Sequence, residues 1–65
     1  MNREEIKLAL EQGERVRHIH FPARWWIEQE GENYKWENGH LILIETFWKY
    51  RESDEFDKDW SIIEK

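Results

Sequence analysis

The sequence predicts an α+β fold, in which one N-terminal helix packs on a small, mostly antiparallel β-sheet. Three observations support this prediction: a capped helical pattern at the start, several short alternating segments after it, and an Asn-Gly pair between two of those segments. Alternation of apolar and polar residues is typical of strands, and Asn-Gly favours a tight hairpin turn. We expect residues 1–65 to form a single domain.

A helix is predicted over residues 3–12. Asn2 followed by Glu5 resembles a capping box, in which each side chain bonds the backbone N–H of the other residue. An apolar stripe at helical spacing is formed by Ile6, Ala9 and Leu10. Gly13 follows this stripe and suits the left-handed conformation that ends many helices.

Short strands are predicted after the helix, over residues 15–21, 25–29, 34–37 and 40–44. In the first strand, Val16, His18 and His20 share one face, and Arg17, Ile19 and Phe21 share the other. A type I′ turn is expected at Asn38-Gly39, because that turn needs positive φ at both positions. Residues 45–56 are predicted to hold a short helix or turn, and a closing strand is predicted around Trp60, Ile62 and Ile63.

The composition limits how a chain of 65 residues can be stabilised. It contains no cysteine, so disulfides and thiolate metal sites are excluded. It contains five tryptophans, three phenylalanines and two tyrosines, and each large aromatic buries roughly 150–250 Å². A domain of this size has a small core, so we expect some aromatic surface to be shared in a homo-oligomer, either a dimer or a tetramer.

The charge distribution argues against duplex DNA or RNA as a partner. The formal net charge is −5, whereas nucleic-acid binding depends on neutralising phosphates. The stretch from Arg15 to Trp26 is nevertheless basic, and the stretch from Glu52 to Asp59 is acidic. The longest apolar run, residues 41–44, is far shorter than the roughly 20 residues of a membrane span, so we expect a cytoplasmic protein.

The adjacent residues Trp25 and Trp26 are a candidate binding feature. Successive side chains of a strand leave opposite faces, so both cannot point into one core. One of them is expected to face a ligand or a second subunit. For any single tryptophan a place in the core is the more common outcome, and the pair weakens that interpretation.

Two segments, IKLALEQGERVRHIHF and DKDWSII, resemble the small phage and prophage domains of the second Thoeris anti-defence family. The resemblance covers about the first 20 and last 8 residues. The family usually has a Trp-x-Pro-Ser segment before the closing strand, and this chain has FWKYRES instead. The resemblance implies an oligomeric protein that traps a nucleotide-derived immune signal, such as a cyclic ADP-ribose isomer or cyclic dinucleotide, without cleaving it. Val16, Arg17 and Trp60 match the family pattern, and only Arg17 is implied as a ligand contact.

A nucleotide site needs flat apolar faces for the base and fixed donors for phosphate. Arg17 and Arg24 are therefore candidate phosphate ligands, and Trp26 with Trp36 or Tyr34 would stack the base. The pair His18 and His20 is placed in the same site, where the two imidazoles face phosphate. The predicted partner is thus a small anionic nucleotide, with no cofactor.

Metal binding and catalysis have little support in the sequence. His18, His20 and His40 could hold zinc, but hydrogen-bonding or phosphate-facing histidines are the more common interpretation. Serines and threonines lie in no nucleophile motif, and there is no glycine-rich phosphate loop. We therefore predict a non-enzymatic protein with no catalytic and no metal site.

The alternative prediction is a protein–protein inhibitor of the DNA-mimic type. The acidic run ESDEFDKD, with Phe56 in its middle, could dock on a basic surface of a host defence or nucleic-acid-handling protein. An inhibitor of this kind would depend on Asp54, Glu55 and Asp57. A nucleotide-binding protein would depend on Arg24 and Trp26 instead.

Overall fold

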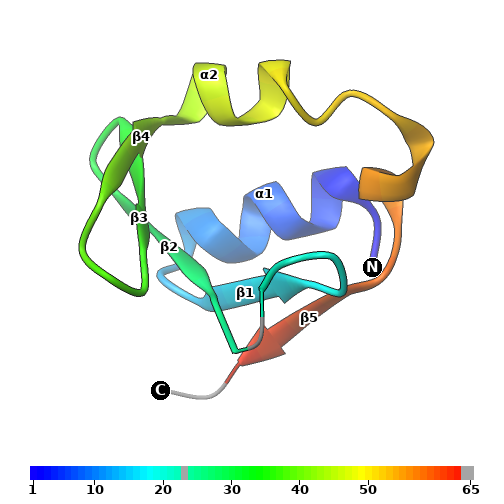
Figure 1. Cartoon of the computed structure of the whole chain (residues 1–65), viewed down its shortest axis with the longest axis horizontal. Helices are drawn as coiled ribbons and strands as arrows, with labels where there is room; N and C mark the ends of the chain where they lie inside the picture. Colours follow the sequence, from blue (N-terminus) through cyan, green and yellow to red (C-terminus); the bar gives the residue numbers. More distant parts are fainter. Residues whose placement is uncertain (23, 64–65) are drawn as a thin grey trace.

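The fold, seen in a computed structural model that describes residues 1–22 and 24–63, has one antiparallel sheet with helices against it (Figure 1). The strand order is β4-β3-β2-β1-β5, and every neighbouring pair is antiparallel. The strands are β1 (Arg15–His18), β2 (Ile27–Glu30), β3 (Asn33–Trp36), β4 (Leu41–Leu43) and β5 (Trp60–Ile63). The helices are α1 (Arg3–Glu11), α2 (Ile44–Lys49) and the short 3₁₀ helix η1 (Asp54–Asp57). The α+β prediction is confirmed.

Helix α1 begins and ends as its sequence predicts. The Asn2 side chain accepts the Glu5 N–H at 2.9 Å, and the Glu5 carboxylate accepts the Asn2 N–H at 2.9 Å, which completes the capping box. Gly13 has φ 87°, and the N–H of Glu14 reaches back to the Ala9 carbonyl at 3.0 Å. This left-handed ending directs the chain from the helix into β1.

Strand β1 is shorter than predicted, and the difference changes which side chains are buried. The strand ends at His18, where the N–H of Phe21 bonds the His18 carbonyl at 3.0 Å and closes a turn. The predicted alternation through residue 21 is therefore wrong. Phe21 is buried in the core, whereas His20 is exposed on the turn.

The connection between β3 and β4 also differs from the prediction. Gly39 has φ 91°, but Asn38 does not have positive φ, so the turn is not type I′. The Gly39 N–H bonds the Trp36 carbonyl and the Trp36 N–H bonds the His40 carbonyl, both at 2.8 Å. A longer hairpin connection with one left-handed glycine accounts for this pattern.

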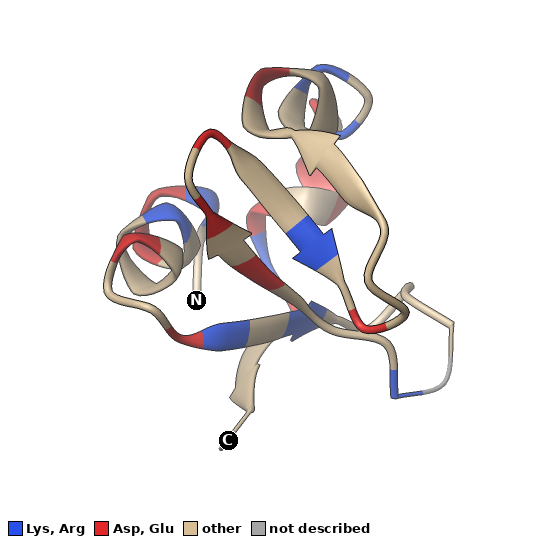
Figure 2. Cartoon of the chain, turned by 90° about the vertical axis from the view of Figure 1, so that its left-hand side faces the viewer, with Lys and Arg blue, Asp and Glu red and all other residues tan. Residues whose placement is uncertain are grey.

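One aromatic core lies between the helices and a single face of the sheet. Helix α1 packs against β1 and β2, and α2 packs against β3 and β4. In Figure 2, β2 and β3 lie in front, with α1 to one side of them and α2 above. The core is formed by Ile6, Ala9, Leu10, Val16, Phe21, Ile27, Tyr34, Phe47 and Trp60, with the fully buried His18 among them.

The opposite face of the sheet, which we call the outer face, carries Arg15, Arg17, Trp26, Glu28 and Lys35.

The predicted short helix within residues 45–56 is present as α2, which begins at Ile44. None of the helices in the described part of the chain has the length and apolarity needed to span a membrane.

Candidate binding site on the outer face

The basic residues of β1 lie on the outer face because of strand alternation. Val16 is fully buried against the core, so its neighbours Arg15 and Arg17 point the other way. Strand β1 pairs with β2 through Val16 and Ile27. This register brings Trp26, the residue before β2, next to Arg17 on the outer face.

A pocket of about 370 Å³ opens on this face. It is lined by Arg17, Arg24, Trp26, Glu37 and Ile63. These side chains come from β1, the loop before β2, the turn after β3 and the last residue of β5. Three of the residues that the sequence suggests as ligand contacts, two arginines and one tryptophan, therefore meet in one place.

The Trp26 ring is held on one side by a row of charged side chains. The Arg15 guanidinium carbon lies 4.1 Å from the centre of the ring, within the range of a cation–π contact. Arg15 Nε lies 3.2 Å from one carboxylate oxygen of Glu28, and Lys35 Nζ lies 3.3 Å from the other. The row crosses three strands and fixes the guanidinium over the indole.

The Glu28 carboxylate lies between the two cations of this row and pairs with both of them. Partial burial alone raises the pKa of the Glu28 carboxyl, but the hydrogen bonds and positive charges of Arg15 and Lys35 outweigh it. The net result is a pKa below the ordinary value of 4.5. The carboxylate therefore stays ionised near neutral pH and holds both cations.

The two arginines of the pocket keep unused hydrogen-bonding capacity. Arg17 Nε is inaccessible to solvent and has no hydrogen-bond partner in the described residues, and its Nη2 lies 3.5 Å from the Phe21 carbonyl, at the limit of a hydrogen bond. Across residues 1–22 and 24–63, Arg17 and Arg24 form no ion pair. A guanidinium presents a planar fork of donors that matches phosphate or carboxylate.

Arg24 is also held in an unusual backbone conformation. Its φ is 63°, in the left-handed region that side-chain-bearing residues rarely adopt. The turn is closed by the Trp25 N–H, which bonds the Pro22 carbonyl at 3.0 Å. Strained positions of this kind are concentrated at binding sites, where the surrounding structure maintains them.

Tyr34 and Trp36 are not part of this pocket, which corrects the site suggested from the sequence. Tyr34 is only 2% exposed, and its hydroxyl accepts the indole N–H of Trp48 at 2.9 Å. Burial raises the pKa of the Tyr34 phenol, as expected for a core residue. Trp36 packs on the inner side of the sheet, where its ring centre lies 5.0 Å from that of Phe21.

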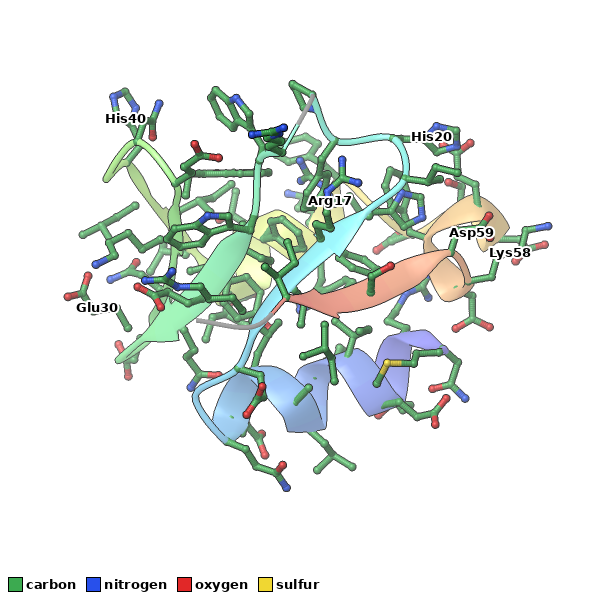
Figure 3. The ribbon with its side chains drawn as sticks, turned by 90° about the horizontal axis from the view of Figure 1, so that it is seen from below. Arg17, His20, Glu30, His40, Lys58 and Asp59 are labelled. Carbon is green, nitrogen blue, oxygen red and sulfur yellow. The ribbon has the colours of Figure 1, made fainter. Side chains whose placement is uncertain are left out.

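The two histidines also lie elsewhere. His18 is fully buried, with Nε2 2.8 Å from the Glu55 carbonyl and Nδ1 accepting the His20 N–H at 3.1 Å. These partners assign the neutral ring with its proton on Nε2. His20 is exposed, 3.8 Å from the Glu55 carboxylate, and Figure 3 shows it well away from His40. The described residues hold no cluster of three ligands suited to a metal.

The acidic segment around η1 is partly a structural element. Phe56, the proposed apolar contact for a protein partner, is half-buried with its ring centre 4.6 Å from that of His18. Its carbonyl accepts the Trp60 indole N–H at 2.8 Å, and the Asp57 carboxylate accepts the backbone N–H of Arg3. The carboxylates are exposed, but Phe56 packs against the core and is not displayed with them.

A larger groove of about 990 Å³ lies between α1 and α2. Its charged lining residues are balanced in sign: Arg3, Lys7 and Lys49 against Glu32, Glu45 and Glu52. Its aromatic residue, Trp48, already has Lys7 Nζ 5.2 Å from the ring centre. The outer pocket combines two arginines with a single carboxylate, so it has the stronger preference for an anion despite its smaller volume.

Three residues of the outer site are absent from the site suggested by the sequence. Arg15 could have been found, because alternation places it on the same face as Arg17. Glu37 and Ile63 could not have been found from the sequence, because they reach the site only through the pairing of β2 with β3 and the position of β5 beside β1.

Among known proteins, no family model, curated protein or solved structure matches the chain.

Proposed function

We propose that this chain binds a small anionic nucleotide in the outer pocket and sequesters it without cleaving it. One observation carries the proposal: Arg17 and Arg24, which form no ion pair in the described residues, line one pocket with the indole of Trp26. The base would stack on the indole and the arginines would bind phosphate. Stacking of a base on an aromatic side chain contributes roughly 1–3 kcal/mol.

The chemistry of the lining supports binding more than turnover. Apart from the arginines, the lining consists of the Trp26 indole, the Glu37 carboxylate and the aliphatic Ile63 side chain. Glu37 is the one group among these that could act as a nucleophile, and the described lining includes no serine, cysteine, threonine, lysine, histidine or tyrosine. The segments of α1–β1 and of β5 resemble an anti-defence family, which is consistent with sequestration by a homo-oligomer in a host cytoplasm. The homo-oligomeric state and the cytoplasmic location are therefore parts of the proposal.

A thermal-shift panel tests the proposal with cyclic dinucleotides, cyclic ADP-ribose isomers and linear nucleotides. A ligand at 100 times its dissociation constant adds about 2.7 kcal/mol, which for a domain of this size raises Tm by roughly 10–20 °C. We expect a shift of this order for at least one nucleotide. Arg24→Ala should remove most of the shift, because it deletes one of the two phosphate donors.

Lys58→Ala is the matched control, since it also removes one exposed positive charge but lies outside the pocket. It should leave the ligand-induced shift unchanged. Equal losses in the two variants would indicate unspecific charge attraction. A flat panel would contradict the proposal and favour an acidic surface that binds a host protein, which substitutions at Asp54 and Glu55 would then test.

A further inference from the structure

Strand β5 forms an edge of the sheet that lacks the usual protection. Exposed strand edges present unpaired backbone groups, and proteins commonly block them with proline, charged residues or very short strands. The opposite edge strand, β4, has three residues and continues directly into α2. Strand β5 has four residues, WSII, with no proline and no charge, and Ile62 is 44% exposed.

The hydrogen-bonding pattern shows which groups of β5 face outward. The N–H of Ile19 bonds the Asp59 carbonyl at 3.1 Å, immediately before the strand. Bonded and non-bonded positions alternate along an antiparallel pair, so Ser61 bonds to β1 whereas Trp60 and Ile62 do not. The N–H and C=O groups of Trp60 and Ile62 therefore point away from the sheet.

We propose that a second copy of this chain pairs its own β5 antiparallel with this edge, which joins two five-stranded sheets into one. Trp60 of each copy then lies opposite Ile62 of the other, and their outward groups bond reciprocally. Ser61 meets its counterpart at the two-fold axis. At such a non-bonded position the Cα atoms approach to about 4.5 Å, which suits a small side chain.

Charge complementarity favours a second copy in this orientation. Asp57 and Asp59, with Lys58 between them, precede the strand, and its last residue, Ile63, lines the pocket that combines Arg17 and Arg24 with Glu37. Figure 3 shows Asp59 at the start of β5 and Arg17 on the adjacent strand. Antiparallel pairing brings the acidic end of each copy to the basic end of the other, and the uncharged strand between them adds no repulsion.

The pairing does not depend on nucleotide binding, so it is tested without a ligand. Sedimentation equilibrium of the whole chain, at concentrations up to about 1 mM, should show a species of twice the 8.2 kDa chain mass. Hydrogen exchange should show protection of the Trp60 and Ile62 amides that decreases on dilution. A monomer leaves both of these amides open to solvent.

Two matched lysine substitutions locate the interface. Ser61→Lys places two like charges at the two-fold axis and should give a monomer, whereas Leu41→Lys, at the exposed β4 edge, should leave the dimer intact. Circular dichroism verifies that both variants are folded. A wild-type monomer at every concentration, or a Ser61→Lys dimer, would overturn the proposal. If Ser61→Lys does not fold, wild-type Ile62 exchange that is unaffected by dilution would overturn it equally.

Discussion

The inner and outer faces of the sheet both carry tryptophan, but the two faces engage it differently. On the inner side, Trp48 of the overlying helix α2 donates its indole N–H to the Tyr34 hydroxyl, and Trp60 of β5 donates its indole N–H to the Phe56 carbonyl. On the outer face, the Trp26 indole N–H has no partner among the described residues, and its ring is held by the Arg15 guanidinium instead.

This difference separates the residues that stabilise the domain from those available to a ligand. The indole N–H groups of Trp48 and Trp60 are satisfied within the chain, as the burial of polar atoms requires. In the outer pocket, the Arg17 guanidinium forms only one long hydrogen bond, to the Phe21 carbonyl, within the described residues. Substitutions on the inner face should therefore reduce stability, and substitutions on the outer face should mainly reduce binding.

The largest expected effect is at Phe47, which is fully buried and lies 4.9 Å from Trp48 between ring centres. Phe47→Ala should lower the free energy of unfolding by about 3–5 kcal/mol, because it leaves a cavity at the centre of the aromatic core. Urea denaturation followed by circular dichroism measures this. Leu41→Ala, on the exposed edge, should cost no more than about 0.5 kcal/mol. Equal losses of unfolding free energy in Phe47→Ala and Leu41→Ala would contradict the conclusion that the inner side stabilises the domain.

The next effect is at His18, whose two ring nitrogens are both bonded inside the core. His18→Phe keeps an aromatic ring but leaves the Glu55 carbonyl and the His20 N–H without their partner. We expect a loss of roughly 2 kcal/mol by urea denaturation. His20→Phe, on the exposed turn, is the matched control and should be nearly neutral. A stable His18→Phe protein would show that these hydrogen bonds are dispensable.

Tyr34→Phe should have a smaller effect, about 1 kcal/mol, because it removes the acceptor for the Trp48 indole N–H. Burial raises the Tyr34 pKa above 10.0 in the folded chain, so the unfolded state ionises first. The contribution of Tyr34 is therefore complete below pH 10.0 and decreases as the pH rises through the folded pKa. Urea denaturation at neutral and alkaline pH should show that the difference in free energy of unfolding between wild type and Tyr34→Phe becomes smaller as the pH rises. A constant gap would contradict the assignment.

The smallest effect on stability is expected at Glu28, on the outer face. Glu28→Gln should cost about 0.5–1 kcal/mol at neutral pH, since its partners Arg15 and Lys35 are partly exposed. The Glu28 pKa is lowered from 4.5, so this contribution is present above pH 4.5 and lost as the pH falls through the folded pKa. Urea denaturation of wild type and Glu28→Gln from neutral pH to below pH 4.5 measures this difference in free energy of unfolding. Glu30→Gln, at a neighbouring position of β2 without an ion pair in the described chain, should cost less at neutral pH than Glu28→Gln.

The sequence predicted most elements correctly because the signals for them are local. The capping box, the glycine after α1 and strand alternation each act within a few residues. The prediction was wrong at Phe21 and His20, because a turn after His18 replaced the expected strand. It was also wrong about the turn type at Asn38, where the loop is longer than a two-residue connection.

The site was predicted only in part, because alternation shows which residues share a face but not which face the helices cover. Tyr34 and Trp36 do lie together, on the inner side. Glu37 and Ile63 enter the pocket through strand pairing between distant segments, which no local pattern specifies. Trp26 was chosen because alternation in a strand over residues 25–29 would separate it from Trp25. Strand β2 begins only at Ile27, but Trp25 does pack on Trp36, with 5.6 Å between the ring centres.

The most direct test of the nucleotide site uses the five tryptophan indole N–H signals as reporters in a ¹⁵N-correlated NMR titration. Cyclic di-GMP, cyclic ADP-ribose and AMP would be added in turn to the folded chain. At least one of them should shift the Trp26 signal strongly and saturably, while the signals of Trp48 and Trp60 move little. Shifts centred on Trp48, or no shift with any of the three, would contradict it.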